Sequence, residues 1–282
     1  MAGSQTRQKT YFNIAMGTLS VVIITLNEEN NIVDCIQSAK KISDDIIIVD
    51  SGSKDQTVAL AKNQGARSFA IEWSGFGYAR NFGAWQAKND WILALDADER
   101  ISDELAASIK KISFSEATRI YKFRRRNYLN GKKILFGTLG FENVKRIYNR
   151  QHCKWDLTPV HEKLIGDNLT LKEIKGQVLH YGLKDLADYK AKAKLYARLS
   201  AEKYFLQGRK TYLLKKYFSA IFNSSKSYFL QLGLLEGTQG LMIAAMVAYY
   251  SWLKYFYLLQ LVRQAKKKDL SFELRSKMKA AS

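Results

Sequence analysis

The N-terminal third of the chain alternates short apolar runs with segments in which apolar residues recur at helical spacing. Residues 19–25 (LSVVIIT) and 45–49 (DIIIV) are rich in β-branched residues, as is typical of strands buried on both faces of a parallel sheet. Between them, apolar residues recur with a helical period over residues 32–42. Further strands are predicted at 66–72 and 91–95. Because parallel strands need a crossover, the pattern predicts an open, mostly parallel α/β sheet.

Other segments carry signals for helix ends and for antiparallel strands. Gly65 is placed to end one predicted helix, and Ser102 is placed to cap the start of another. After that helix, longer polar–apolar alternations are typical of antiparallel strands. The remaining predicted elements are helices at 56–64, 78–88, 103–112 and 184–207 and strands at 119–129 and 145–150.

These elements divide the chain into three predicted parts. Residues 1–18 form an N-terminal extension, residues 19–183 an α/β domain, and residues 184–282 a helical region. A chain of 282 residues that is 47% hydrophobic is able to bury a sizeable core. Two cysteines cannot form a disulfide framework, and no apolar core of a signal peptide precedes the first strand. We therefore expect an intracellular protein.

The charge changes this picture. The chain has 45 Lys and Arg against 26 Asp and Glu, a net charge of +19, and the excess lies mostly after residue 150. Between Lys203 and Leu235 there is no acid, and cations alternate with aromatic residues. Such a segment favours an anionic surface. We expect a membrane surface and no nucleic acid, because no nucleic-acid-binding motif accompanies the charge.

A long apolar run follows this basic segment. Residues 240–253 are apolar, Lys254 interrupts them, and 255–262 continue the run before a basic tail. The uninterrupted part is shorter than a spanning helix requires, so an interfacial attachment is favoured. A single spanning helix over 240–262 with its basic end cytoplasmic, and a buried core helix, are the alternatives.

Polar loops follow the predicted strands, where open α/β sheets bind their ligands. The fourth strand is followed by Asp96 and Asp98, two carboxylates one residue apart that can reach a hard divalent cation such as Mg²⁺ or Mn²⁺. The second strand is followed by Asp50, which can accept from an imide or a ribose hydroxyl. An Asx turn and a helix cap explain Asp55 better than Asp50.

The order SVVIITLNEENNI, IIIVDSGSKDQT, GFGYARNFGA and WILALDADER resembles the family 2 glycosyltransferases, which have the nucleotide-sugar-binding GT-A fold. The continuation through RRRNYLNGKKI, PVHEKL and LHYG is similar to the branch with lipopolysaccharide core glucosyltransferases. The resemblance implies inverting transfer from a nucleotide-sugar, with a metal held by Asp98 and Asp96. It implies the following donor-site residues: Thr25, Asn27, Glu28, Asp50, Arg80 and Asp96.

An inverting transfer needs a base for the acceptor hydroxyl. Glu162, in the motif Pro159 to Glu162, is the candidate, and Asp156 and Glu99 compete with it. His180 and Tyr181 can reach a diphosphate, although a structural role is favoured for both.

Three consecutive cations, Arg124, Arg125 and Arg126, point to both faces of their predicted strand, so that one can meet an anionic acceptor or all can be solvated. We expect a membrane-associated transferase at the cytoplasmic face of the inner membrane, with a UDP-sugar donor and a lipid-carried glycan acceptor. The alternatives are a polyprenyl-phosphate glycosyltransferase and a non-catalytic module that binds membranes or polyanions.

Overall fold

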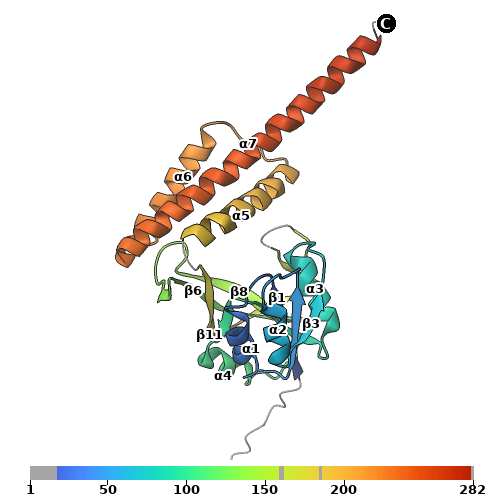
Figure 1. Cartoon of the computed structure of the whole chain (residues 1–282), viewed down its shortest axis with the longest axis vertical. Helices are drawn as coiled ribbons and strands as arrows, with labels where there is room; N and C mark the ends of the chain where they lie inside the picture. The colour runs from blue at the N-terminus through green and yellow to red at the C-terminus, as the bar shows by residue number, and fades with distance from the viewer. Residues whose placement is uncertain (1–17, 159–161, 184–185, 281–282) are drawn as a thin grey trace, which may run out of the picture.

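The computed structural model describes residues 18–158, 162–183 and 186–280, and it has two parts, an α/β sheet domain and a group of C-terminal helices (Figure 1). The predicted N-terminal extension lies outside the described residues except for Thr18. The nine strands of the main sheet are β1 (Leu19–Thr25), β2 (Asp45–Asp50), β3 (Arg67–Ala70), β4 (Trp91–Asp96), β5 (Glu99–Ile101), β6 (Arg119–Leu129), β7 (Lys132–Lys133), β8 (Phe141–Asn149) and β11 (Thr170–Leu183).

The strand order is β3-β2-β1-β4-β8-β6-β11-β5, with β7 paired to β6. β1 pairs in parallel with β2 on one side and with β4 on the other. The direction of strand addition therefore reverses at β1, and open α/β sheets bind ligands at such a switch point, beyond the carboxyl ends of the strands. The parallel-rich α/β sheet is confirmed and is consistent with a GT-A fold.

β1 has an uninterrupted apolar sequence because both of its faces are covered. Val21 and Ile23 belong to one buried cluster with residues of α1 (Ile32–Ala39), α2 (Thr57–Asn63) and α4 (Asp103–Ile109). Val22 belongs to a second cluster with α3 (Phe76–Gln86). A Cβ at Gly83 of α3 would lie 2.3 Å from Val22 Cγ1, so a larger residue would push α3 away from the sheet.

The second half of the sheet is mixed. β6 pairs antiparallel with β8, as the alternation predicts, but it pairs in parallel with β11. β11 in turn pairs antiparallel with β5, which directly follows the Asp96–Asp98 turn. This pairing brings residues far apart in sequence to the end of β4. A small second sheet consists of β9 (Lys154–Trp155) and β10 (Leu164–Ile165).

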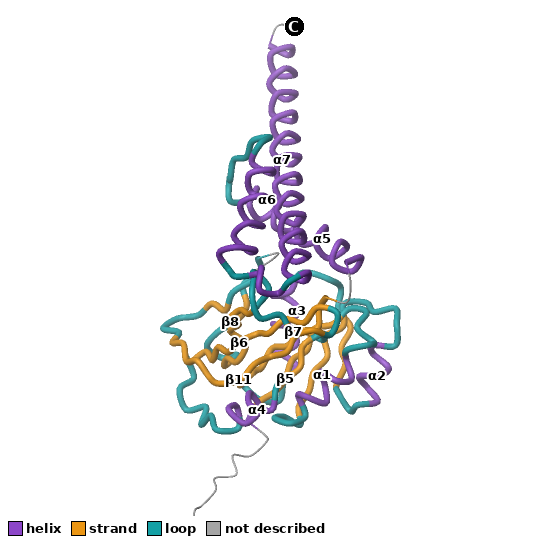
Figure 2. The backbone as a smooth tube through the Cα atoms, turned by 90° about the vertical axis from the view of Figure 1, so that its left-hand side faces the viewer, coloured by secondary structure: helices purple, strands orange, loops and turns teal. Residues whose placement is uncertain are grey.

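The C-terminal helices are α5 (Leu186–Leu206), α6 (Lys215–Ser225) and α7 (Thr238–Ala280), with a π-helical turn (Lys226–Leu230) and a 3₁₀ turn (Gly233–Glu236) before α7. α5 and α6 pack along the first half of α7, and its second half projects beyond them (Figures 1 and 2). The apolar run at 240–262 supplies buried residues to this packing: Ile243, Met246, Leu253 and Leu258.

The apolar run is thus the core of a helical group, which was the unfavoured alternative. The physical reason is that α5 and α6 each offer an apolar side to α7, and burial between helices removes the same apolar area from water as a bilayer would. No helix within the described residues is both long and apolar enough to cross a membrane, contrary to the alternative of a spanning helix.

The helices are joined to the sheet domain through the loop between β7 and β8. The Glu236 carboxylate accepts hydrogen bonds from the backbone N–H groups of Leu135, at 2.6 Å, and Phe136, at 2.8 Å. Beneath them, Leu129, Ile134 and Ile243 form a small buried cluster that contains residues of both parts. The helical group is therefore docked against the sheet domain.

Candidate active site

The loops after β1 and β2 are bonded to each other at the switch point. The Asp50 carboxylate accepts from the backbone N–H of Gly52 and of Ser53, at 3.0 and 2.9 Å, and from the Ser53 hydroxyl. Asn27, with φ of 56°, donates its backbone N–H to the Ser53 hydroxyl. Its side-chain carbonyl accepts from the N–H of Lys54 at 2.8 Å. Asp50 thus forms an Asx turn, and so does Asp55, as the sequence predicted, because its carboxylate accepts the backbone N–H of Thr57 at 3.0 Å ahead of α2.

Thr25 and Glu28 begin the first of these loops. The Thr25 hydroxyl is buried and has no hydrogen-bond partner among the described residues. Glu28 accepts from the side-chain amide of Asn31 at 2.7 Å, and its backbone N–H donates to the Thr57 hydroxyl. Since an unpaired buried hydroxyl is costly, Thr25 marks a place where a ligand atom would stabilise the site.

Asp96, the last residue of β4, is held by two buried arginines. One carboxylate oxygen lies 2.6 Å from Arg80 on α3, and the other lies 3.0 Å from Arg146 on β8. Burial opposes ionisation of Asp96, but Arg146 and Arg80 outweigh it and hold the pKa of the carboxyl well below its ordinary value. The two arginines therefore favour the ionised carboxylate, and both of its oxygens are engaged.

Asp98 differs from Asp96 because one of its oxygens has no partner. Oδ1 is buried without a hydrogen bond among the described residues, and Oδ2 lies 3.4 Å from His180 Nε2. Burial opposes ionisation of Asp98 as well, but His180 and Lys192 outweigh it and lower the pKa of this carboxyl. A Cβ on Gly182 would lie 2.4 Å from His180 Nε2 and 2.8 Å from Asp98 Oδ2, so glycine leaves room for the pair.

The orientation of His180 follows from its neighbours. The Asn127 amide nitrogen donates to the Leu139 carbonyl at 2.8 Å, which turns the Asn127 side-chain oxygen toward His180 Nδ1, 2.5 Å away. His180 Nδ1 is therefore the donor of this bond, and Nε2 faces Asp98. A histidine fixed through one ring nitrogen presents the other to a metal or to an acid.

Asp98 and His180 are the residues of the site that best suit a divalent cation. Asp98 offers an unpartnered carboxylate oxygen and His180 an imidazole nitrogen, and both are ligand types that Mn²⁺ accepts. Asp96 is a weaker candidate ligand because both of its oxygens bind arginines. No group of three or more His, Cys, Asp or Glu in the described ranges forms a metal site by itself. A bound cation would thus need ligand oxygens from the substrate or from water.

Glu162 reaches the same site through Arg80, with which it forms a buried ion pair. The two other candidates for the base, Glu99 and Asp156, are engaged by other groups of the protein. Glu99 is fully buried and accepts from the Asp96 backbone N–H at 3.0 Å. Asp156 accepts from the backbone N–H of Lys163 and from the Thr158 hydroxyl. Residues 159–161 of the PVHEKL motif lie outside the described residues.

The three consecutive arginines of β6 divide between two faces, and two of them serve the protein itself. Arg125 pairs with Glu99, at 3.4 Å, and with Glu142. Arg126 donates to the backbone carbonyls of Ile134 and Gly140. Arg125 and Arg126 therefore do not form a solvated strand face, because the buried Glu99 carboxylate and backbone carbonyls bind them, whereas Arg124 is exposed and its proposed contact with an acceptor stays a prediction.

α5 closes one side of the site. Tyr196 of α5 stacks on Phe76, with ring centroids 6.0 Å apart, and Phe76 lies beside Arg80. The surrounding protein and the carboxylates of Asp96 and Asp98 raise the pKa of Tyr196 to about 12. Lys192, one turn earlier, donates to the Gly182 carbonyl at 2.7 Å. The first C-terminal helix thus contributes polar groups to the sheet-domain site.

Comparison with known proteins gives the family. The model of glycosyl transferase family 2 matches residues 20–161, about half of the chain. The chain belongs to this family. It is therefore a glycosyltransferase, as the sequence motifs predicted.

Relatives extend this similarity past the matched segment. The chain is 27% identical over 274 residues to an uncharacterised glycosyltransferase of Rickettsia typhi, covering 93% of this chain and 90% of that protein. It is 28% identical over 218 residues to the lipopolysaccharide core biosynthesis glycosyltransferase LpsC of Rhizobium meliloti, covering 75% of this chain and 80% of LpsC.

Solved structures are more distant. TarS of S. aureus aligns with a TM-score of 0.42 and 14% identity over 81% of this chain and 48% of TarS. Glucosyl-3-phosphoglycerate synthase of Mycobacterium tuberculosis aligns with a TM-score of 0.31 and 23% identity over 40% of this chain and 44% of that one.

Several residues of the site escaped the sequence analysis. In the sequence, Arg146 is one basic residue of an alternating strand, and Lys192 and Tyr196 are positions on the helix predicted over 184–207. His180 was assigned a structural role. Only the pairing of β8 with β4, the pairing of β11 with β6 and β5, and the docking of α5 bring these residues to the end of β4.

Proposed function

We propose that this family 2 glycosyltransferase moves a sugar, with inversion, from a UDP-linked donor to a hydroxyl group of a lipid-carried glycan of the lipopolysaccharide core type. The observation that carries the proposal is Asp98, a buried carboxylate with one unpartnered oxygen, beside His180 at the switch point of the sheet. The name of the Rhizobium meliloti relative supports the acceptor class. The proposed location is the cytoplasmic face of the inner membrane.

In this proposal Asp98 and His180 hold Mg²⁺ or Mn²⁺. When bound, the cation supplies positive charge to the diphosphate leaving group. Asp96, fixed between Arg80 and Arg146, supplies negative charge beside it. The loops that begin at Thr25 and Asp50 receive the nucleotide, and the unpartnered Thr25 hydroxyl is free to bond it.

Glu162 is the proposed base. Its ion pair with Arg80 favours the ionised carboxylate, the form that accepts a proton. Glu162 takes the proton of the acceptor hydroxyl while the hydroxyl oxygen bonds to the anomeric carbon. The bond from that carbon to the diphosphate oxygen breaks, and its electron pair leaves with UDP. The hydroxyl oxygen enters from the face of the anomeric carbon opposite the leaving diphosphate, so this single displacement inverts the configuration.

A lipid-carried acceptor agrees with the surface of α6. Phe218, Ile221 and Phe222 share one side of this helix and are 63 to 65% exposed. Exposed aromatic and aliphatic side chains on a basic helix are typical of attachment to a membrane surface. This surface, rather than the apolar run in α7, is the proposed membrane contact.

Titration calorimetry of UDP and UDP-sugars, with and without Mn²⁺, tests the donor site. We expect metal-dependent binding that Asp98→Ala abolishes and Asp103→Ala retains, because Asp103 is an exposed acid whose ion-pair partner is Lys41, away from the site. Binding of UDP-sugars that is unchanged in Asp98→Ala would refute the assignment.

The base is tested separately with Glu162→Gln. We expect transfer to a hydroxyl acceptor to fall by about 10²- to 10⁴-fold, with donor binding unchanged, since proton transfer contributes roughly that much. Full activity of Glu162→Gln would instead favour a phosphate acceptor, which is already an anion and needs no base.

A further inference from the structure

A cavity of about 330 Å³ lies among the C-terminal helices, well apart from Asp98 in sequence and lined by a different set of groups. Its lining combines cations, tyrosines and one leucine: Tyr204, Arg209, Lys210, Lys215, Tyr255 and Leu258. Tyr204 comes from the end of α5 and Tyr255 from α7, while Arg209 and Lys210 follow α5 and Lys215 begins α6. The cavity therefore exists only because the three helices are packed together.

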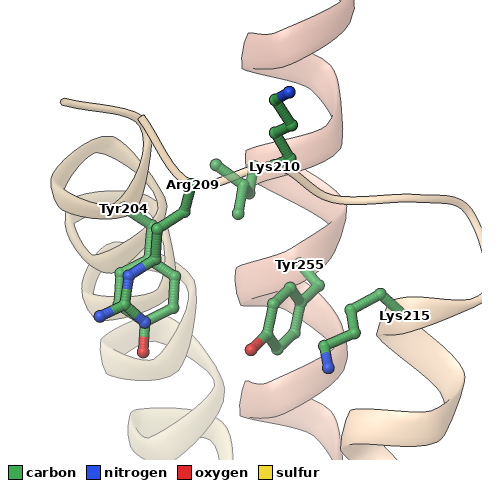
Figure 3. A pocket seen from close by; sticks show the side chains of 6 residues that line it. Tyr204, Arg209, Lys210, Lys215 and Tyr255 are labelled. Carbon is green, nitrogen blue, oxygen red and sulfur yellow. The ribbon is translucent and has the colours of Figure 1, made fainter. Parts of the chain in front are cut away.

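The cations of this cavity lie against aromatic rings. The Arg209 guanidinium carbon lies 4.1 Å from the centroid of Tyr204, and Lys215 Nζ lies 5.9 Å from that of Tyr255. Lys254 Nζ lies 5.0 and 5.1 Å from the same two rings. In Figure 3 the Arg209 side chain lies over Tyr204 and Lys215 extends beside Tyr255, whereas Lys210 points away from both.

None of these cations has a carboxylate partner within the described residues, since every ion pair found there involves other groups. A ring face attracts a cation but leaves its N–H groups able to donate. A pair of cations flanking one cavity, with no acid to neutralise them, is complementary to a tetrahedral anion.

The segment of chain between the lining residues Lys210 and Lys215 indicates what carries the anion. Tyr212, Leu213 and Leu214 stand between Lys210 and Lys215 in the chain, and each is more than half exposed. They continue into the exposed apolar side of α6. Exposed apolar residues between two cations of the cavity suit a ligand with a phosphate next to hydrocarbon, and a soluble phosphate would leave these residues in water.

We propose that this cavity binds the phosphate of an anionic membrane lipid, with Arg209 and Lys215 as its donors and residues 212–214 against the acyl chains. The inference rests on the membrane attachment proposed above, but it does not depend on the sugar donor or on Asp98. It assigns the helical group a specific lipid site in addition to a general affinity for membranes.

Sedimentation of the full chain with phosphatidylcholine vesicles, with and without phosphatidylglycerol, tests the proposed lipid site. We expect Arg209→Gln/Lys215→Gln to bind phosphatidylglycerol vesicles about 10- to 30-fold more weakly, since each cation near an anionic surface contributes about 1 kcal/mol. The charge-preserving variant Arg209→Lys/Lys215→Arg should bind within a few-fold of the parent chain. The matched control Lys172→Gln/Lys175→Gln removes two exposed charges from β11 and should bind like the parent.

The outcomes distinguish the proposed lipid site from the proposed membrane attachment of the chain. If the control and the cavity variant lose vesicle binding equally, the loss comes from net charge alone. That result would overturn the lipid site but not the proposed membrane attachment. Failure of the parent chain to bind either vesicle would overturn both. Inorganic phosphate or glycerol phosphate that displaces the parent chain at millimolar concentration would identify a soluble phosphate, and not a lipid, as the ligand.

Discussion

The sheet domain and the helical group use their positive charge in opposite ways. At the end of β4, Arg80 and Arg146 are buried and ion-paired with Asp96, and Arg80 also binds Glu162. In the helical group, Arg209 and Lys254 lie on tyrosine rings. Cations that neutralise internal acids organise a site, whereas cations without acids remain available to an external anion. The net charge of the chain therefore does not by itself distinguish cations that serve the site from cations that face an external anion.

The largest expected effect concerns the one acid of the site with an unpartnered oxygen. We expect Asp98→Asn to lower the transfer rate by about a thousandfold or more, because metal-assisted stabilisation of a leaving group contributes several kcal/mol. The rate of transfer from the UDP-sugar that binds in the calorimetric titration, measured at saturating Mn²⁺, checks this prediction. Addition of a chelator should lower the rate of the parent chain to a similar extent. A loss below tenfold would remove Asp98 from the reaction.

The next prediction compares an arginine that is ion-paired in the sheet domain with an arginine that lies on a tyrosine ring in the helical group. Arg146→Met leaves Asp96 and Glu99 with less compensation in a buried place, and we expect it to lower the free energy of unfolding by about 3 to 5 kcal/mol. Arg209→Gln, in the helical group, should change it by no more than about 0.5 kcal/mol. Urea unfolding of both variants measures these changes. Similar losses of unfolding free energy in the two variants would mean that the two regions do not use their cations differently.

Asp45 tests how a buried acid of the sheet domain, paired with an arginine, contributes to stability at different pH values. It is almost fully buried, accepts from Ser20 at 2.6 Å and from the N–H of Lys88 at 2.8 Å, and pairs with Arg67. Burial raises the pKa of Asp45, but these bonds outweigh it and hold the pKa below its ordinary value.

Because the folded-state pKa is the lower one, Asp45 stabilises the protein above about pH 4, and this contribution is lost as the pH falls through the folded value. We expect Asp45→Asn to cost about 2 kcal/mol at neutral pH and progressively less below about pH 4. Unfolding measured across pH checks it, with the exposed neighbour Asp44→Asn as the control. A cost that is constant with pH would mean that ionisation of Asp45 contributes nothing.

The smallest effect concerns the apolar surface of α6. Phe218 is 63% exposed, so Phe218→Ser should leave stability nearly unchanged but weaken vesicle binding by about fivefold to tenfold. Trp85→Ser removes an aromatic residue of the sheet domain that is 75% exposed, and it should leave vesicle binding unchanged. Equal effects of the two substitutions would mean that the α6 surface has no special role.

Local patterns were sufficient for much of the fold. The β-branched runs predicted β1 and β2 closely, and Ser102 caps α4 by accepting from the N–H of Leu105. The position of Asp96 and Asp98 at a strand end also followed from the sequence, because the apolar run before them ends there. These features depend on residues within one element, where spacing and burial are directly related.

Tertiary structure decided everything that depends on which elements meet. The sequence favoured lipid as the cover of residues 240–262, with a buried core helix as an alternative, whereas in the structure α5 and α6 pack against this run. It likewise placed Asp98 after a predicted strand, but it predicted no strand around His180. Only the antiparallel pairing of β5 with β11 brings His180 against Asp98, because strand order is set by the packing of the whole sheet and not by any local pattern.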